Sequence, residues 1–268
     1  MVSIVLPTYN RGALIGRAIR SVLDQTYQDF ELIVVDDGST DATAEEVGRV
    51  GDRRVRYIRL AENRGAGAAR NVGIRDAAAR FIAFQDSDDE WARVKLEHHM
   101  RVFERAAPTV GVVYSDMHRI WRDGITHYHR SPTVVPGVLI DPHTRTYQVY
   151  KLGIQSTVIR REWLARCGGF DEMLPALEDL ELFLRLSKCC EFVHLRVPLV
   201  NYFETDGLSN NQAVKLAART RLLEIYRNEL EREDRTFVIR EAAALGLAAA
   251  REAACSADRG PIAAGLRP

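Results

Sequence analysis

The first 116 residues alternate between short apolar runs and amphipathic stretches, and this alternation restricts the possible folds more than any other feature. The apolar runs occupy residues 2–6, 30–35, 55–60, 81–84 and 110–116. The stretch after the first run carries apolar residues at helical spacing, namely Leu14, Ile15, Ala18, Ile19, Val22 and Leu23. Strands that alternate with helices form right-handed βαβ units, whose parallel strands are covered on both faces. We therefore predict an α/β protein with a mostly parallel, mixed sheet flanked by helices.

Polar clusters follow four of these apolar runs, where each predicted strand ends. They read "PTYNR" (7–11), "DDGSTD" (36–41), "ENRG" (62–65) and "QDSDD" (85–89). Parallel strands place their carboxyl ends at one edge of the sheet, and ligands of such sheets bind outside that edge. Four independent loops at one edge predict a binding site there.

Composition excludes several classes of protein. Hydrophobic residues make up 46%, charged residues 28%, and the formal net charge is +0 without a long basic run. This balance argues against nucleic acid, or an anionic membrane face, held by bulk electrostatics. No apolar stretch approaches the roughly 18 residues of a transmembrane helix, and the start lacks a signal-peptide pattern. The four cysteines form no CxxC pair, so we expect reduced thiols and a cytoplasmic location.

The alternation ends after residue 116. We predict a hairpin turning at Asp123-Gly124, an irregular and flexible Pro-rich loop over 131–150, and a helix over 178–186. From Gln212 the chain is rich in Ala, Arg, Glu and Leu and predicts two or three helices. The expected organisation is a domain over 1–210, with halves 1–116 and 117–210, and a C-terminal helical extension over 211–268. Packing on the domain, homodimerisation and peripheral membrane contact stay open as roles for that extension.

Six motifs together resemble one enzyme family. In chain order they are "PTYNR", "VVDDGSTD", "NRGAGAARNVGI", "FQDSDDEW", "GGFDE" and "LEDLELFLRL", and with their spacing they resemble the family 2 glycosyltransferases. The resemblance covers roughly Ser3 to Ser209. It implies a Rossmann-like GT-A fold with a nucleotide-binding first half and an acceptor-binding second half.

The resemblance also implies an activity. A family 2 enzyme transfers a sugar, with inversion, from a nucleoside diphosphate sugar, most often a UDP-sugar. The acceptor is a hydroxyl of a glycan, a lipid-linked glycan or a small molecule. The processive relatives carry a Gln-x-x-Arg-Trp motif on a membrane-associated helix, and this chain has neither. Single-transfer chemistry, in the cytoplasm or at the inner face of the membrane, is therefore expected.

Asp86 and Asp88 form an Asp-x-Asp sequence at a predicted strand end. A leaving diphosphate is stabilised by a hard divalent cation held by one or two carboxylates and phosphate oxygens. The resemblance implies that Asp88 binds Mn²⁺ or Mg²⁺ directly and that Asp86 reaches the ribose or the metal. The alternative is a solvated helix start, in which Asp89 and Glu90 begin a helix over 91–106.

The other donor-binding residues come from the strand-end loops. The resemblance implies that Asp37 accepts a hydrogen bond from the base, typically uracil, and that Arg70 points towards the nucleotide or diphosphate. We expect Pro7 to fix a turn that brings Thr8 and Tyr9 into the same pocket. The predicted donor-binding residues are Pro7, Thr8, Tyr9, Asn10, Arg11, Asp37, Asn63, Gly65, Arg70, Asp86 and Ser87.

"GAGAAR" also resembles part of a dinucleotide-binding fingerprint, which would indicate an oxidoreductase. That fingerprint belongs to the first βα turn of its fold, and here Arg70 replaces its third glycine. Gly65 and Gly67 are better explained by close approach of a helix to the sheet.

Transfer requires a base that takes the proton of the acceptor hydroxyl. The resemblance of "LEDLELF" to the family's Glu-Asp pair assigns this role to Asp179, with Glu178 orienting the acceptor or Asp179. An acidic helix start is the alternative. His127 and His129 are predicted to share one face of a strand, and Tyr202 and Ser209 lie in a segment that resembles the family's cover over the donor diphosphate.

Two further classes of protein stay open beside the transferase. A sugar-phosphate nucleotidyltransferase uses a similar fold and metal, but its Gly-rich basic loop after the first strand does not match "PTYNRG". A nucleotide-sugar-binding protein without turnover would keep the donor site alone.

Overall fold

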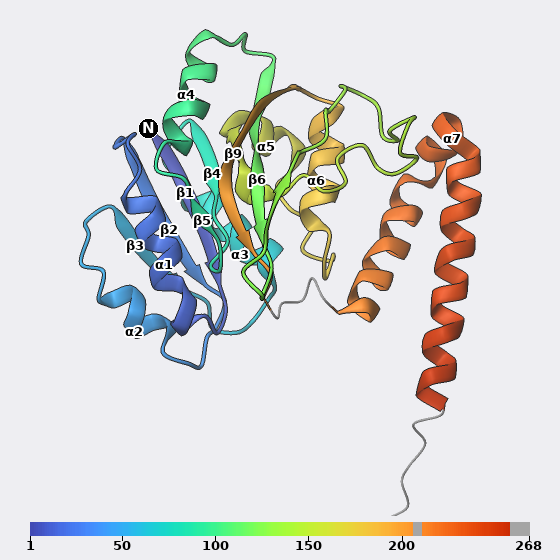
Figure 1. The fold of residues 1–268 in the computed structure, drawn as a ribbon, viewed down its shortest axis with the longest axis horizontal. Helices are drawn as coiled ribbons and strands as arrows, with labels where there is room; N and C mark the ends of the chain where they lie inside the picture. Colours follow the sequence, from blue (N-terminus) through green and yellow to red (C-terminus); the bar gives the residue numbers. More distant parts are fainter. Residues whose placement is uncertain (206–210, 258–268) are drawn as a thin grey trace, which may run out of the picture.

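The computed structural model describes residues 1–205 and 211–257, so the predicted Ser209 contact and the last eleven residues of the extension lie outside the described residues. A nine-stranded mixed sheet lies between helices (Figure 1). The strand order is β3-β2-β1-β4-β8-β6-β9-β5, and β7 pairs with β6 off this path. The predicted α/β class, with a mixed sheet flanked by helices and a C-terminal helical extension, is confirmed.

The first half of the chain builds the parallel part of the sheet. β1 pairs with β2 and with β4, and β2 pairs with β3, all in parallel. The register sets Thr8 beside Asp36, so the loops after β1 and β2 begin at the same level. The elements are β1 (Val2–Thr8), α1 (Gly12–Leu23), β2 (Phe30–Asp36), α2 (Thr43–Gly48), β3 (Val55–Arg59), α3 (Ala66–Asp76) and β4 (Phe81–Phe84).

The second half makes the sheet mixed. β8 runs antiparallel to both β4 and β6, whereas β9 runs parallel to β6. The predicted hairpin at Asp123-Gly124 is confirmed as the connection between β6 and β7. The elements are β5 (Glu90–Trp91), α4 (Lys95–Arg105), β6 (Val110–Ile120), β7 (Thr126–His129), the 3₁₀ helix η1 (Ile154–Ser156), β8 (Thr157–Arg160), α5 (Arg161–Cys167), α6 (Glu178–Ser187) and β9 (Glu191–Phe203).

The predicted helix over 91–106 is wrong at its start. Glu90 and Trp91 form the short strand β5 on β9, and α4 begins at Lys95. Asp89 is fully buried, and its carboxylate accepts hydrogen bonds from the Phe203 amide (2.9 Å) and the Gln155 side chain (3.0 Å). The predicted role of Asp89 as a solvated capping residue is therefore wrong, because its carboxylate binds two segments that are distant in the sequence.

Successive side chains of the strands enter two cores, one on each face of the sheet. Ile4 and Leu6 of β1 pack with apolar residues of α1 and α4, and Val5 packs in the core that contains residues of α3, α5 and α6. A Cβ at Gly73 in α3 would lie 2.4 Å from Val5 Cγ1. The close helix–sheet approach expected of Gly65 and Gly67 is made instead at Gly73.

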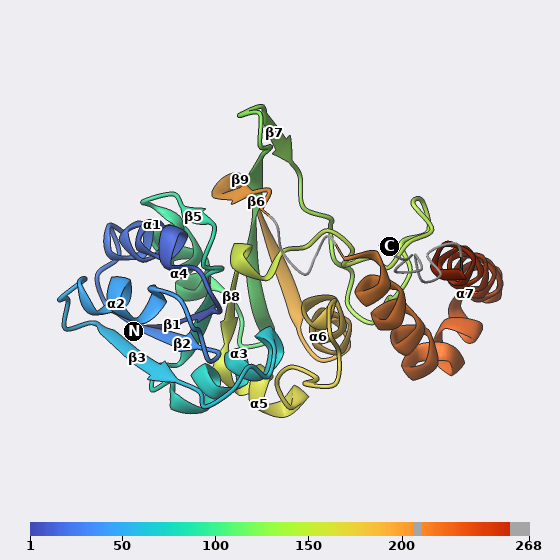
Figure 2. The same cartoon turned by 90° about the horizontal axis from the view of Figure 1, so that it is seen from below.

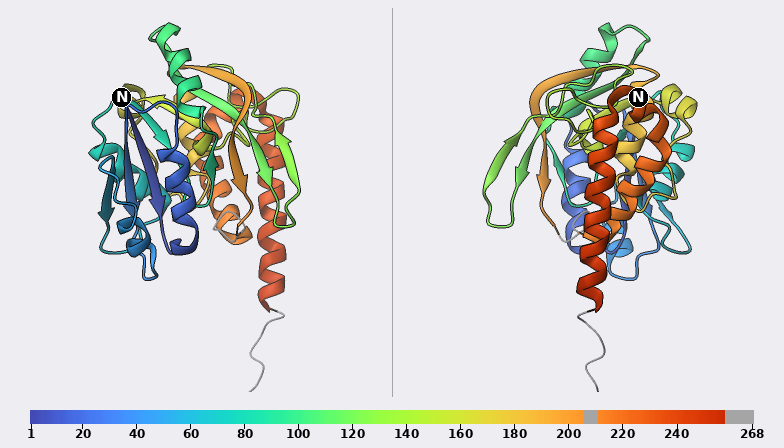
Figure 3. Two further views of the ribbon diagram at one scale, coloured as in Figure 1. Left: turned by 60° about the vertical axis from the view of Figure 1, so that its left-hand side comes forward. Right: turned by 90° about the vertical axis from the view of Figure 1, so that its right-hand side faces the viewer.

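The C-terminal extension packs on the domain. α7 (Gln212–Ala257) consists of two helices that meet at Asp234, whose φ of −152° and ψ of 87° are not helical, and the second helix is the red one in Figure 3. The Tyr226 hydroxyl donates to Glu181 Oε1 of α6 (2.9 Å). Glu233 accepts from the Leu139 and Ile140 amides (2.9 and 2.8 Å), so these contacts tie the irregular loop over 131–150 to α7.

No helix within residues 1–205 and 211–257 is long and apolar enough to cross a bilayer.

Candidate functional site

A cavity of about 860 Å³ opens at the carboxyl edge of the parallel strands. Its lining brings together predicted residues from three separate parts of the chain, namely Asn63, Gly65, Arg70, Asp86, Asp88, Glu178 and Asp179. The other predicted donor residues lie at the same sheet edge but do not line this cavity: Pro7, Thr8, Tyr9, Asn10, Arg11, Asp37 and Ser87.

Arg70 joins the two acidic motifs. Its buried guanidinium donates from Nη1 to Glu178 Oε1 (2.6 Å) and from Nη2 to Asp86 Oδ1 (2.8 Å). Burial acts to lower the pKa of Arg70, but the negative charges of Asp86 and Glu178 outweigh it and raise that pKa. The arginine therefore stays charged and fixes the distance between the Asp-x-Asp sequence and the start of α6.

Asp86 and Asp88 follow β4 and face the cavity from one side. Burial is the largest influence on Asp86 and raises its pKa; Arg70 opposes this effect and Asp88 adds to it. Asp88 Oδ2 accepts from the Thr205 hydroxyl (2.5 Å), and the Asp88 carbonyl accepts from Arg17 Nη2 (2.5 Å). The loop is thus held both by α1 and by the residues that follow β9.

The carboxylate oxygens of Asp86 and Asp88 suit a divalent cation whose coordination is completed by a bound ligand. In the part of the chain that the structure describes, no three His, Cys, Asp or Glu side chains form a metal-binding group. Mg²⁺ is usually bound by one or two carboxylates together with phosphate oxygens and water, rather than by a cage made only of protein atoms. Two carboxylates beside a cavity match that arrangement.

Asp179 lies in the first turn of α6, next to Glu178, and lines the cavity. Leu177, the residue immediately before α6, adopts a left-handed conformation (φ 60°), which directs the chain into this helix. Asp179 Oδ1 accepts from the Leu180 amide (2.8 Å). Burial raises the pKa of Asp179 to about 7, with the Glu178 charge adding to the effect and Arg70 opposing it. A carboxyl with a pKa near 7 is well suited to general-base chemistry at neutral pH.

The loops after β1 and β2 are tied together at the same edge. Asn10, with φ 52°, donates its backbone N–H to Ser39 Oγ (2.9 Å), and its side-chain Oδ1 accepts from the Thr40 backbone N–H (2.8 Å). Thr8 Oγ1 is buried and has no hydrogen-bond partner among residues 1–205 and 211–257, which leaves a polar atom available at this edge.

Asp37 holds the third loop. Its carboxylate accepts from the amides of Arg64 (2.8 Å) and Gly65 (2.7 Å), where Gly65 has a φ of 91°. Each carboxylate oxygen has a further lone pair, so the base-binding role of Asp37 stays a prediction. The observed role is to position Asn63 and Gly65 on the cavity wall.

The cavity lining also includes basic side chains that no sequence motif identified. Arg119 comes from the β6–β7 hairpin, Lys151 from the irregular loop and Lys215 from the first turn of α7, and His129 of the hairpin lines the cavity as well. Their positions depend on how the second half of the chain folds over the first, so local sequence patterns carry no signal for them. The predicted shared face of His127 and His129 is confirmed by their pairing with alternate residues of β6.

Comparison with known proteins places the chain in a family. The family model for glycosyl transferase family 2 matches residues 3–168. A curated relative, the Escherichia coli UDP-Glc:alpha-D-GlcNAc-diphosphoundecaprenol beta-1,3-glucosyltransferase WfgD, is 45% identical over 97 residues, which are 36% of this chain and 38% of that protein. The matched segments of two other curated relatives span 17% and 48% of their lengths.

Solved structures share the fold. The structure of Staphylococcus aureus TarS residues 1–349 in complex with UDP-GlcNAc matches with a TM-score of 0.66 at 22% identity, covering 83% of this chain and 66% of that one. The mannosyltransferase PcManGT from Pyrobaculum calidifontis, in complex with GDP-Man and Mn²⁺, matches with a TM-score of 0.63 at 22% identity, covering 100% of this chain and 76% of that one. With the family model matching more than half of its length, the chain belongs to glycosyltransferase family 2.

Proposed function

We propose that this chain is a metal-dependent, inverting, non-processive glycosyltransferase that uses a UDP-sugar. The observation that carries the proposal is the cavity in which Arg70 bridges Asp86 and Glu178, and which Asp88 and Asp179 also line. The complexes of TarS with UDP-GlcNAc and of PcManGT with GDP-Man and Mn²⁺ support a nucleotide-sugar donor and a divalent ion.

Asp86 and Asp88 would hold Mn²⁺ or Mg²⁺ against the donor, where the ion supplies charge stabilisation for the departing diphosphate. Asp179 accepts the proton of the acceptor hydroxyl as that oxygen attacks the anomeric carbon. Glu178, fixed by Arg70, positions this base. Attack opposite the diphosphate inverts the anomeric configuration.

The basic side chains of the cavity lining favour an acceptor that carries phosphate. Arg119, Lys151 and Lys215 line the cavity, and such cations pair well with phosphate oxygens. The curated relative WfgD acts on a sugar linked to diphosphoundecaprenol. We propose a lipid-linked sugar diphosphate as the acceptor, and a protein that works in the cytoplasm or at the inner face of the membrane.

A thermal-shift screen of nucleoside diphosphates and nucleotide sugars, with and without Mn²⁺, tests the donor assignment. We expect stabilisation by UDP and a UDP-sugar that depends on Mn²⁺, and release of UDP when acceptor is added. Pyrophosphate release from UTP and a sugar phosphate would instead identify a nucleotidyltransferase. Binding without any UDP release would leave a nucleotide-sugar-binding protein.

A further inference from the structure

The β6–β7 hairpin projects from the body of the molecule (Figure 2). Met117 pairs with His129 and Arg119 with His127, and paired residues of antiparallel strands share one face. Met117, Arg119 and His129 line the cavity. This face of the hairpin, which we term the cavity face, therefore continues the cavity wall outwards.

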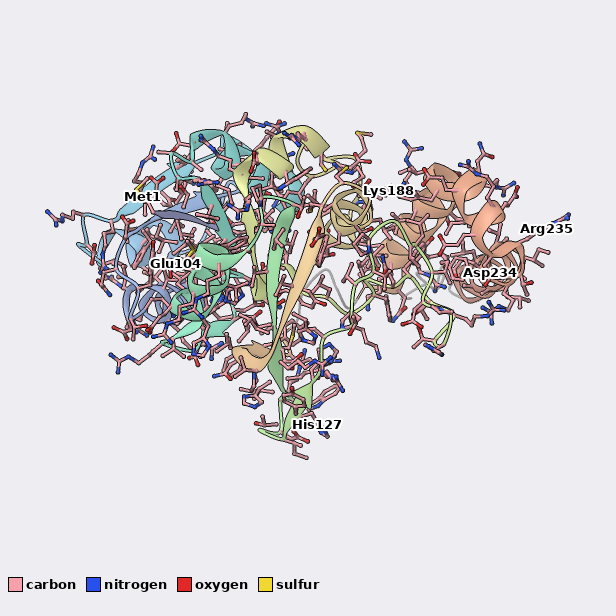
Figure 4. All side chains as sticks on the ribbon, turned by 90° about the horizontal axis from the view of Figure 1, so that it is seen from above. Met1, Glu104, His127, Lys188, Asp234 and Arg235 are labelled. Carbon is pink, nitrogen blue, oxygen red and sulfur yellow. The ribbon has the colours of Figure 1, made fainter. Side chains whose placement is uncertain are left out.

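Aromatic and aliphatic side chains lie along the hairpin. Ile125, at the turn, and Tyr128, whose hydroxyl donates to Asp116, are each 54% exposed. On the cavity face the Arg119 guanidinium lies 4.2 Å from the centre of the Trp121 ring, and His127 contacts the same ring edge-on at 6.2 Å. Figure 4 labels His127 at the far end of this projection.

The hairpin is also positively charged, although the chain as a whole is not. Residues 117–131 contain Arg119, Arg122 and Arg130 against the single acid Asp123, a formal charge of +2 before any of three histidines is protonated, whereas the full chain is at +0. Arg119 has an acidic neighbour in Glu204, at 3.5 Å. Of the three arginines, Arg122 lies at the outer end beside the turn, whereas Arg130 follows β7 at the base of the hairpin.

We propose that the outer end of the β6–β7 hairpin binds the surface of an anionic phospholipid bilayer and holds the mouth of the cavity against the membrane. Trp and Tyr favour the headgroup level of a bilayer, and basic residues beside them are attracted to anionic lipids. Because the cavity face runs from this end into the cavity, docking places the cavity where a lipid-linked acceptor lies. The inference goes beyond the proposed transfer reaction, and its test needs neither donor nor metal.

Vesicle sedimentation tests the contact directly. The full chain should sediment with vesicles that contain phosphatidylglycerol, and much less with pure phosphatidylcholine, in a salt-dependent way. The double variant Arg122→Glu/Ile125→Glu, at the turn of the hairpin, should lower the partition coefficient by about tenfold or more. Both residues are exposed and lie outside the cavity lining. The control Arg53→Glu, an exposed charge reversal beside β3 at the other edge of the sheet, should bind as the wild type does.

Tryptophan fluorescence gives a second measurement that locates the contact. Of the three tryptophans, Trp91 is 4% exposed and Trp163, in α5, packs against the core at the other end of the hairpin-bearing strand β6. Quenching by lipids with brominated acyl chains should therefore act on Trp121, and Trp121→Phe should remove it while leaving vesicle binding measurable by sedimentation.

Several results would overturn the proposal. One is the absence of binding to phosphatidylglycerol vesicles; another is binding that Arg235→Glu on α7 (labelled in Figure 4) abolishes and the hairpin variant does not. A dimer in solution that the hairpin variant dissociates would assign the surface to a second copy of the chain. Mn²⁺-dependent UDP binding should be the same in the wild type and in every variant. If the wild type shows no such binding, the proposed function is refuted and the membrane contact is not.

Discussion

Asp179→Asn should abolish transfer and at the same time stabilise the protein. The asparagine keeps the size of the side chain and an oxygen that can accept from the Leu180 amide, but it cannot take up a proton from the acceptor. Loss of a general base typically lowers the rate by about 10²- to 10⁴-fold. Donor affinity should be unchanged, because the variant leaves Asp86 and Asp88 intact.

The stability gain follows from the raised pKa. Burial raises the pKa of Asp179 to about 7, against roughly 4 in an unfolded chain. Three pKa units at about 1.4 kcal/mol each correspond to an upper bound of about 4 kcal/mol by which the ionised carboxylate destabilises the fold above pH 7. Because this side chain is partly exposed, we expect about 1–3 kcal/mol to be recovered by asparagine.

The pH dependence has a definite sign. Above pH 7 the ionised Asp179 carboxylate lowers the stability of the folded state by the full amount. The effect decreases as the carboxylate becomes protonated below pH 7, and it is absent below about pH 4. Denaturant unfolding of both proteins at pH 8 and pH 4.5 should show the advantage of the variant shrinking at the lower pH. The exposed Glu104→Gln on α4 (Figure 4) is the control and should change neither quantity. Full turnover in Asp179→Asn, or lower stability at pH 8, would refute the reasoning.

Three further variants test the rest of the site and the core. Asp88→Ala should remove the Mn²⁺-dependent part of UDP affinity measured by calorimetry, and full retained affinity would exclude it as a metal ligand. Arg70→Ala should destabilise by about 3–5 kcal/mol, because it leaves Asp86 and Glu178 without their shared partner; an unchanged melting temperature would contradict this. Gly73→Ala should lower stability by about 1–3 kcal/mol in denaturant unfolding, since its Cβ would overlap Val5, and no loss would show that α3 can move away.

Much of the fold could be predicted from local pattern. The apolar runs that became β1 to β4 and the turn at Asp123-Gly124 follow from alternation and turn chemistry, which act over a few residues. The start of α4 could not be predicted, because Glu90 and Trp91 pair with β9, a strand that begins a hundred residues later. Acidic residues before a helix look the same whether they cap it or, as with Asp89, anchor a distant strand.

The sequence by itself determined which polar loops share one edge of the sheet, because parallel strands in βαβ units all end on the same side. The tertiary structure alone decided which of their side chains meet. Arg70 and Glu178 are 108 positions apart, and the basic lining residues of the second half and the cavity face of the hairpin come from segments with no motif. Even the neutral total charge concealed a local basic surface on the hairpin. Such contacts depend on how the two halves of the sheet pack together, and no short-range periodicity encodes that packing.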